Sequence, residues 1–431
     1  MKKIHFIGIG GIGISALARF LKEKGYEISG SDLKASKITA ELEKEGVAIS
    51  IPHGEKNVIG KDLVIYSAAI KAQNAEFKKA KALGIKTLSR KEALPLILRD
   101  KQVFAVAGAH GKSTTSSILA SLMNDASVII GAILKEFGSN MIYKESDKLI
   151  FEADESDSSF LNANPYVAIV TNAEAEHLEH YKNDLKKLHK AYEQFLNSAK
   201  IRVINGEDEF LKTLNLSAIK LYPSKDIKNY AVSVKDYKPR TSFTLKDYGE
   251  FCVLGMGYHL AVDAALAILA ALEFKSVDEV RVRLENYKGI KKRFDILVAD
   301  EKHAIIDDYG HHPTEISATL KAASEYARLA GYSKITAIFE PHRYTRLVAN
   351  LEQFKDAFAR VSELVILPVY AAGEKPVSVD LKAHFPKATF IKDIKRIGEV
   401  LVDDEGRVYE DGLIIGFGAG DISVKLRGGE L

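Results

Sequence analysis

The sequence predicts an α/β protein of three domains, each built around a mostly parallel sheet. Short apolar strands alternate with helical patterns along the chain, which is typical of parallel sheets. This alternation starts anew near residues 100 and 293, and 431 residues are too many for one ordinary core. We therefore expect domains at 1–99, 100–292 and 293–431.

The strands of each predicted domain end in polar or glycine-containing loops. The first domain has strands in KIHFIGI, YEISGSD and DLVIYSAAI, with a helix in IGISALARFLKEKG. The second has QVFAVA, KLIFEADESD and YVAIVTNAEAEH. The third has HAIIDDYGHHPTEI, ITAIFEPHRY, LVILPVY and GLIIGFGAGD. Because ligands of parallel sheets gather at the carboxyl ends of the strands, we expect the functional residues in these loops.

Composition argues against several classes of function. The chain has 61 basic and 58 acidic side chains, so its charge gives no reason to expect a nucleic acid or an anionic membrane as partner. Cys252 is the only cysteine, which excludes an internal disulfide and favours the cytoplasm. No run of 18 apolar residues occurs, so membrane insertion is not expected. A monomer and a homodimer both remain possible.

A phosphate-binding loop is predicted in VAGAHGKSTT, between a strand and a helix. Its glycines let backbone N–H groups turn around an anion, and the helix N-terminus adds partial positive charge. Lys112 supplies a charge for the β- and γ-phosphates, and Ser113 a hydroxyl for Mg²⁺. The pattern is shortened, since Val106 stands where the full motif has glycine.

Two further loops of the second domain carry candidate metal ligands. IFEADESD contains four carboxylates, of which Glu152 ends the strand, and IVTNAEAEHLEHY contains His177. Close carboxylates repel one another unless a cation or solvent separates them. A magnesium site is one interpretation of this loop, and a solvated acidic loop is the other.

The N-terminal FIGIGGIG has the G-x-G-x-x-G spacing at Gly8, Gly10 and Gly13. Asp32 follows about twenty residues later, after a strand. This pattern predicts a diphosphate at a helix N-terminus but does not separate a dinucleotide from a nucleotide-sugar. In the third domain, DDYGHHPTE, EPHRYTR and GAGD bring histidines and arginines to strand ends, where they can bind a carboxylate or a phosphate.

Taken together, these motifs resemble those of the Mur ligase family, in the family's order and over nearly the whole chain. They are HFIGIGGIGIS, GAHGKSTT, EADESD, YKGIKKRFD, DDYGHHPTEI and PHRYTR. The resemblance implies a Rossmann-like N-terminal domain, a central P-loop ATPase domain and a Rossmann-like C-terminal domain. It also implies an enzyme of cytoplasmic peptidoglycan synthesis that uses ATP and Mg²⁺ (or Mn²⁺). Its reaction would join L-alanine to the lactyl carboxylate of UDP-N-acetylmuramate through an acyl phosphate.

The resemblance assigns site residues to four groups. The ATP-binding group is Gly108, Ala109, His110, Gly111, Lys112, Ser113, Thr114, Arg293 and Asp308. The UDP-sugar group is Gly10, Gly11, Ile12, Asp32, His53, Ser67, Ala69 and Arg90. The amino-acid group is Tyr309, His311, His342 and Arg346, and the metal ligands are Ser113, Glu152 and His177. The implied catalytic residues are Lys112, Glu152, His177, His342 and Arg343.

The chain departs from the family pattern at some positions. Leu260 and Asp263 stand where relatives usually have asparagines near the adenine, which leaves that contact open. Tyr192 stands where sister ligases carry a carbamylated lysine, so we expect no carbamate here. The base that deprotonates the amine is either His342 or His311. An NAD-dependent oxidoreductase is the rival from another class, but it would leave the phosphate loop unexplained.

Overall fold

The computed structural model describes residues 2–156, 158–176 and 178–429, and the chain forms two compact units. Unit 1 comprises Met1–Asn229, Phe243–Phe251 and His259–Tyr287, and unit 2 comprises Tyr230–Ser242, Cys252–Tyr258 and Lys288–Leu431. The predicted α/β class with mostly parallel sheets is confirmed. The boundaries at 99/100 and 292/293 stay predictions.

A five-stranded parallel sheet with the order β3-β2-β1-β4-β5 begins unit 1. Its strands are β1 (Lys3–Ile7), β2 (Glu27–Ser31), β3 (Ala48–Ser50), β4 (Leu63–Tyr66) and β5 (Lys86–Ser89). Its helices are α1 (Ile12–Glu23), α2 (Lys37–Lys44), α3 (Ala75–Ala82) and α4 (Arg90–Ile97), with a short 3₁₀ turn, η1 (Glu55–Val58). The strand order reverses direction at β1, which is where a parallel sheet opens a crevice for ligands.

A seven-stranded sheet with the order β12-β11-β10-β6-β9-β7-β8 follows, parallel except for the β7–β8 pair. Its strands are β6 (Gln102–Ala107), β7 (Ser127–Leu134), β8 (Ser139–Ile142), β9 (Lys148–Glu152), β10 (Val167–Val170), β11 (Ile201–Asn205) and β12 (Ile219–Leu221). The helices of this part are α5 (Lys112–Leu122), α6 (Leu185–Ser198), α7 (Pro223–Asp226), α8 (Tyr258–Ala271) and α9 (Val277–Glu285), with η2 (Ser159–Asn162), η3 (Leu178–Tyr181) and η4 (Leu211–Thr213).

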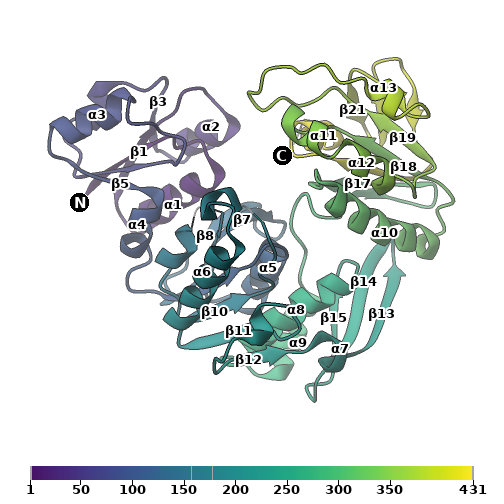
Figure 1. Cartoon of the computed structure of the whole chain (residues 1–431), viewed down its shortest axis with the longest axis horizontal. Coiled ribbons are helices and arrows are strands. Elements are labelled where there is room, and N and C mark those ends of the chain that lie inside the picture. Colours follow the sequence, from purple (N-terminus) through teal and green to yellow (C-terminus); the bar gives the residue numbers. More distant parts are fainter. Residues whose placement is uncertain (1, 157, 177, 430–431) are drawn as a thin grey trace. The chain divides into compact units, whose positions relative to one another are not determined.

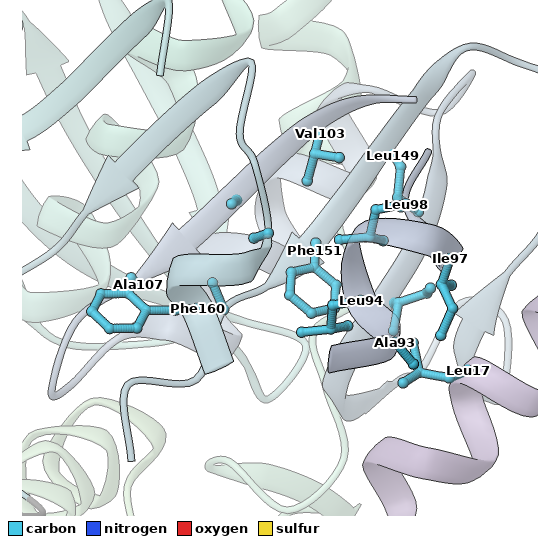
Figure 2. Packing of buried hydrophobic residues seen from close by; sticks show 14 of the residues in the cluster. Leu17, Ala93, Leu94, Ile97, Leu98, Val103, Ala107, Leu149, Phe151 and Phe160 are labelled. Carbon is cyan, nitrogen blue, oxygen red and sulfur yellow. The ribbon is translucent and has the colours of Figure 1, made fainter. Parts of the chain in front are cut away.

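One continuous hydrophobic core joins these two sheets within unit 1. The same buried cluster contains Leu94 and Ile97 of α4 and Leu17 of α1. It also contains Phe151 of β9 and Phe160 of η2. Figure 2 shows Leu94 next to Phe151, with the other α4 side chains close to Leu17. The loops of both sheets are therefore held on one packed body.

Unit 2 contains a six-stranded sheet with the order β16-β17-β24-β18-β19-β20, parallel except for β16–β17. Its strands are β16 (Asp295–Ala299), β17 (His303–Asp308), β18 (Ile335–Phe339), β19 (Glu363–Ile366), β20 (Thr389–Phe390) and β24 (Gly412–Phe417). Its helices are α10 (Pro313–Ala330), α11 (Tyr344–Ala349), α12 (Leu351–Ala357), α13 (Leu381–His384) and α14 (Ile422–Leu426). They lie in the green and yellow part of Figure 1.

Two small sheets complete the chain. One has the order β13-β14-β15, formed by β13 (Ile227–Lys235), β14 (Lys238–Leu245) and β15 (Glu250–Leu254). The other is antiparallel, formed by β21 (Ile394–Ile397), β22 (Val400–Asp403) and β23 (Val408–Tyr409). Within residues 2–156, 158–176 and 178–429, none of the helices combines the length and the apolar character that a membrane span requires.

Candidate functional site

The glycine loop after β1 meets the end of β2. The Gly10 N–H donates to Asp32 Oδ2 at 2.8 Å, and a Cβ at Gly10 would lie 2.9 Å from that oxygen, so a side chain there would displace the Asp32 carboxylate. Gly11 begins α1 without a capping side chain, whereas α2 and α4 each start with a full capping box. Helix α1 therefore presents its N-terminal N–H groups to an anion rather than to a side chain of its own.

Other predicted sugar-nucleotide residues line the same edge of the first sheet. A Cβ at Gly8 would lie 3.1 Å from Ser67 Cβ, and Ser67 Oγ accepts from the Ala69 N–H at 3.4 Å. Arg90 lies beside the first turn of α1, where a Cβ at Gly13 would be 3.5 Å from its Cζ. The buried Nε of Arg90 has no hydrogen-bond partner among the described residues, and such an unpaired donor is suited to an anionic ligand.

The predicted phosphate loop is braced by the end of β10. Thr171 Oγ1 donates to the His110 carbonyl at 2.5 Å, while the Asn172 side chain accepts from the His110 N–H and donates to its carbonyl. Gly108 has φ +141° and its Cβ would lie 2.0 Å from Thr171 Oγ1. The loop conformation thus depends on glycine and on a strand end far away in sequence.

Helix α5 starts at the phosphate loop, and it too lacks a capping side chain. Its N-cap Gly111 has φ +82°, and a Cβ there would lie 2.3 Å from Asp263 Oδ1. The residue that replaces the usual asparagine of the adenine region therefore packs against the phosphate loop.

Lys112 folds back over its own loop. Its Nζ donates to the Gly108 carbonyl at 2.5 Å, to the Ala109 carbonyl at 3.3 Å and to Glu155 Oε1 at 2.9 Å. Glu155 is buried, and its Oε2 has no hydrogen-bond partner in the described part of the chain. Burial raises the pKa of Glu155 above its ordinary value, although the Lys112 charge opposes the shift.

Ser113 and Glu152 form the oxygen pair expected for a magnesium ion. Ser113 Oγ donates to Glu152 Oε1 at 3.0 Å, and the Gly131 N–H donates to Glu152 Oε2 at 2.9 Å. A hydroxyl and a carboxylate are ligands that Mg²⁺ prefers. Across the described residues, no three His, Cys, Asp or Glu side chains lie close enough to hold a metal ion. The predicted ligand His177 lies outside the described residues.

A chain of hydrogen bonds joins the phosphate loop to the N-terminal glycine loop within unit 1. Asn140 on β8 is buried, and its Nδ2 donates both to the Ile12 carbonyl and to the Ile130 carbonyl, each at 3.3 Å. Gly131 follows Ile130, and its N–H donates to the Glu152 carboxylate, which also accepts a hydrogen bond from the Ser113 hydroxyl. The starts of α1 and α5 are therefore positioned through the same three strands, β8, β7 and β9.

A cluster of basic and aromatic side chains lies at the carboxyl end of β18 in unit 2. Arg346 Nη1 and His342 Nδ1 are 3.1 Å apart, and the His342 ring stacks on Tyr370 with centroids 5.5 Å apart. Because arginine only donates, Nδ1 of His342 is the acceptor, and in the neutral ring Nε2 carries the proton. Arg343 has φ +69°, an unusual conformation that its N–H bond to the Tyr370 carbonyl helps to hold.

Burial and nearby positive charges lower the basicity of the histidines in this cluster. Burial is the largest cause that lowers the pKa of His342, and Arg346, His311 and Arg343 add to it, which gives a pKa of about 4. Burial also lowers the pKa of His311. His311 lies close by, with ring centroids 5.9 Å from His342 and 5.3 Å from Tyr309.

Asp308 is the last residue of β17, and its side chain is buried. It accepts from the Phe294 N–H at 2.8 Å and from the Gly310 N–H at 2.9 Å. Burial nevertheless raises its pKa to about 6, against the opposing charge of Arg293. Arg293 lies over the Tyr309 ring, 5.7 Å from its centroid, and 3.9 Å from Glu315.

Family models match three successive segments of the chain. A model described as "Mur ligase family, catalytic domain" matches residues 3–102, "Mur ligase middle domain" matches 106–271, and "Mur ligase, glutamate ligase domain" matches 292–410. The chain belongs to the Mur ligase family.

Several Mur ligases are similar to this chain over its full length. It is 75% identical over 427 residues to the UDP-N-acetylmuramate–L-alanine ligase of Campylobacter jejuni subsp. jejuni, with 99% of both chains covered. The enzyme of that name from Helicobacter pylori is 52% identical, with 99% of this chain and 96% of the relative covered. The crystal structure of the UDP-N-acetylmuramate-alanine ligase of Thermotoga maritima matches with a TM-score of 0.82 at 28% identity, covering 99% and 98% of the two chains.

The structure brings most of the predicted Mur ligase site residues into local groups. In unit 1 it places the glycine loop beside Asp32, Ser67 and Arg90, and the phosphate loop beside Glu152. In unit 2 it gathers Tyr309, His311, His342, Arg343 and Arg346. The roles assigned to these residues stay predictions.

Sequence reasoning missed residues that hold these groups in place. Asn140, Thr171 and Asn172 brace the two loops of unit 1, and Tyr370 stacks on His342 in unit 2. The position of Thr171 and Asn172 directly after a strand was a usable signal, because that edge also carries the phosphate loop. Asn140 lies within a strand, and no local pattern marks it.

Proposed function

We propose that this chain joins L-alanine to the lactyl carboxylate of UDP-N-acetylmuramate with the hydrolysis of ATP, as a step of cytoplasmic peptidoglycan synthesis. The substrates come from the names of its full-length relatives, one of them 75% identical. Membership of a family of ATP-dependent ligases supports ATP as the energy source.

One geometric observation carries the proposal. The hydrogen-bond path through Asn140 ties the start of α1 to the Ser113–Glu152 pair at the start of α5. A sugar nucleotide at one helix start and ATP at the other would then be held on one packed core. Such positioning of two reactants is the main requirement of phosphoryl transfer.

Unit 1 supplies the groups for the first chemical step. A carboxylate oxygen of the sugar nucleotide attacks the γ-phosphorus, ADP leaves, and an acyl phosphate forms. Lys112 leaves its loop carbonyls and Glu155 to pair with the phosphate oxygens, and Arg90 pairs with negative charge on the sugar nucleotide. Ser113, Glu152 and His177 would hold Mg²⁺, which neutralises charge on the phosphates.

Unit 2 supplies the groups for the amino acid. The guanidinium groups of Arg343 and Arg346, with Nε2–H of His342, suit the carboxylate of L-alanine. The neutral amine nitrogen then attacks the acyl carbon, the bond to the phosphate oxygen breaks, and the proton lost by the nitrogen leaves with the phosphate as HPO4²⁻. A ring with a pKa of about 4 is a weak base for an ammonium group, so His342 fits carboxylate binding better than proton removal.

Phosphate release tests the proposal directly. The purified chain is incubated with ATP, Mg²⁺, UDP-N-acetylmuramate and L-alanine, and each component is omitted in turn. We expect stoichiometric phosphate and UDP-N-acetylmuramoyl-L-alanine only in the complete mixture. Phosphate release without L-alanine, or no product in the complete mixture, would contradict the assignment.

A second experiment tests the alternative, within the same family, that the chain is a murein peptide ligase. The fold is shared with a murein peptide ligase of Psychrobacter arcticus, at a TM-score of 0.67 and 21% identity. L-alanine is therefore replaced by the tripeptide L-alanyl-γ-D-glutamyl-meso-diaminopimelate, which gives its name to a ligase of similar fold from Neisseria. Faster turnover with the tripeptide than with L-alanine would assign the chain to the tripeptide reaction instead.

A further inference from the structure

A fully buried carboxylate lies at the carboxyl edge of the first sheet. Glu76 of α3 has no exposed surface, and its two oxygens accept hydrogen bonds from four donors. Oε1 accepts from the Gly54 N–H at 2.9 Å and from Asn57 Nδ2 at 2.6 Å. Oε2 accepts from Ser31 Oγ at 2.5 Å and faces His5 Nε2 at 3.3 Å.

This set of donors keeps Glu76 ionised. Burial alone would raise its pKa, but the hydrogen bonds from His5, Ser31, Gly54 and Asn57 outweigh burial and lower the pKa to about 2. A carboxylate in that state only accepts hydrogen bonds. The hydrogen atom between Ser31 and Glu76 therefore belongs to the Ser31 hydroxyl.

The Ser31 proton fixes the tautomer of a second histidine. Ser31 Oγ also lies 2.8 Å from Nδ1 of His53. A hydroxyl has one proton, and that of Ser31 is used in the hydrogen bond to Glu76, so this contact needs the proton on His53 Nδ1. In the neutral ring, Nε2 of His53 is then a hydrogen-bond acceptor. The side chain of His53 is 14% exposed, whereas that of His5 is 1% exposed.

Ser31 also joins this histidine to the glycine loop. It is the last residue of β2, and its carbonyl accepts from the N–H groups of Gly8 at 2.8 Å and Ile9 at 3.0 Å. The next residue, Asp32, accepts from Gly10. The hydroxyl of Ser31 thus holds the His53 loop while its carbonyl holds the glycine loop.

We propose that Glu76 and Ser31 are positioning residues that hold His53 as a hydrogen-bond acceptor for an N–H or O–H donor of the sugar nucleotide. This inference rests on the proposed function for the identity of the ligand. In UDP the donors available are the imide N–H of uracil and the ribose hydroxyls. An Nε2–H tautomer would repel these donors. The positions of the protons on Ser31 and His53 therefore decide whether the site accepts uridine.

Nuclear magnetic resonance of ¹⁵N-histidine in the full chain reads the tautomer without any ligand. The His53 signals are assigned with His53→Gln. We expect a ring with its proton on Nδ1 and none on Nε2. Glu76→Gln should move the proton to Nε2, because the amide NH₂ donates to Ser31 and frees the hydroxyl to donate to His53. A proton on Nε2 in the wild-type chain would overturn the proposal.

Binding of UDP, measured by calorimetry, tests the consequence in a matched pair of variants. Ser31→Ala removes the contact to His53, and the lost hydrogen bond should raise the Kd about five- to tenfold. Ser29→Ala is the control, since Ser29 lies two residues earlier on β2 and its hydroxyl contacts the other histidine, His5, at 3.0 Å. We expect its Kd to stay within about twofold of wild type. Equal effects of the two variants would overturn the positioning role.

Turnover separates positioning from a general loss of structure. At saturating sugar nucleotide, Ser31→Ala should keep the kcat and the KM for ATP of the wild type, while its KM for UDP-N-acetylmuramate rises. Because Glu76→Gln removes a buried charge and risks misfolding, this serine pair keeps the inference testable on its own. A fall in kcat with an unchanged KM for the sugar nucleotide would contradict the inference.

Three analogues distinguish the donors on the ligand. N3-methyl-UDP lacks the imide proton, and 2′-deoxy-UDP and 3′-deoxy-UDP each lack one ribose hydroxyl. One of them should bind the wild-type chain about tenfold more weakly than UDP, and Ser31→Ala should reduce this difference. If none differs from UDP, His53 accepts from no such donor and the inference fails. If the wild-type chain binds no UDP at all, the sugar-nucleotide assignment fails, while the tautomer is still decided by the resonance experiment.

Discussion

The charged Lys112 side chain is held at the phosphate loop by hydrogen bonds. Its three acceptors all belong to the loop or to Glu155, and none belongs to the sugar-nucleotide loop. Lys112→Ala should therefore abolish product formation and leave the Kd for UDP-N-acetylmuramate unchanged by calorimetry. Lys148→Ala is the matched control, because Lys148 is also a partly buried lysine, paired with Asp125 at 2.8 Å. A comparable loss of sugar-nucleotide affinity in Lys112→Ala would contradict the assignment.

Glu152 is the residue through which the metal requirement can be tested. Its replacement by glutamine exchanges a charged oxygen ligand for a neutral amide at the same position. We expect the Mg²⁺ concentration for half-maximal activity to rise at least about tenfold, because Mg²⁺ depends strongly on carboxylate ligands. A magnesium titration of the activity measures this, and an unchanged midpoint would remove Glu152 from the site.

Asp308 makes a prediction about pH. In the folded chain it holds its proton up to about pH 6, whereas an unfolded aspartate releases it near pH 4. Because the folded state binds more protons in this interval, Asp308 lowers the free energy of unfolding as pH rises from about 4 to about 6.

Asp308→Asn does not titrate, which isolates this contribution. Its free energy of unfolding, relative to that of the wild type, should increase by about 3 kcal/mol between pH 4 and pH 7, from roughly two units of pKa difference. Urea unfolding of both proteins at several pH values measures it. A difference between them that stays constant with pH would show that burial does not raise the pKa of Asp308.

At the level of elements, the start of α5 depends on a glycine for two separate reasons. Gly111 needs φ +82°, and it has no room for a Cβ beside Asp263. Gly138, in the turn between β7 and β8, has φ +64°, but no atom of the residues that the structure describes comes within 4 Å of its Cβ position. Replacing Gly138 with alanine thus adds backbone strain alone, whereas replacing Gly111 adds backbone strain and a steric overlap with Asp263.

Comparing alanine substitutions at these two glycines therefore separates the effect of backbone strain from the effect of a displaced phosphate loop. Gly111→Ala should raise the KM for ATP at least about tenfold, because overlap with Asp263 displaces the loop. Gly138→Ala should leave that KM within about twofold and lower the melting temperature by a few degrees. Steady-state kinetics and thermal melting measure both. A similar KM in the two variants would mean that the loop tolerates the overlap.

The same elements show what the sequence could and could not predict. Helices α1 and α5 were predictable because apolar residues recur at helical spacing and a glycine loop follows each preceding strand. The strands β13, β14 and β15 were not predicted. Their side chains alternate in burial, as expected for a small sheet with one covered face, and no motif of a nucleotide site marks them. The Glu76 cluster was not predictable either, because its members at 5, 31, 53, 54, 57 and 76 meet only through the strand order.

Across the whole molecule, the shared core makes unit 1 one cooperative body. Residues 1–99 and the second sheet should open together, so a ligand of the first sheet also protects the second. At 100 times its Kd, UDP-N-acetylmuramate should slow amide exchange about 100-fold in β6 and β9 as well as in β1. Mass spectrometry of hydrogen exchange measures this. Protection confined to residues 1–99 would show that the two sheets unfold separately.

This core also limits how relatives can recombine their genes. A crossover at residue 99 would pair Leu94 of one parent with Phe151 of another, inside an interior that is sensitive to single methylene groups. A crossover near residue 288 separates no members of that cluster, but it divides unit 2, which also contains Tyr230–Ser242 and Cys252–Tyr258. The proposed sugar-nucleotide site and the phosphate loop are thus inherited as one block. If unit 2 is exchanged whole, with Tyr230–Ser242 and Cys252–Tyr258 beside the segment that carries Tyr309, His342 and Arg346, we expect the choice of amino acid to change with it.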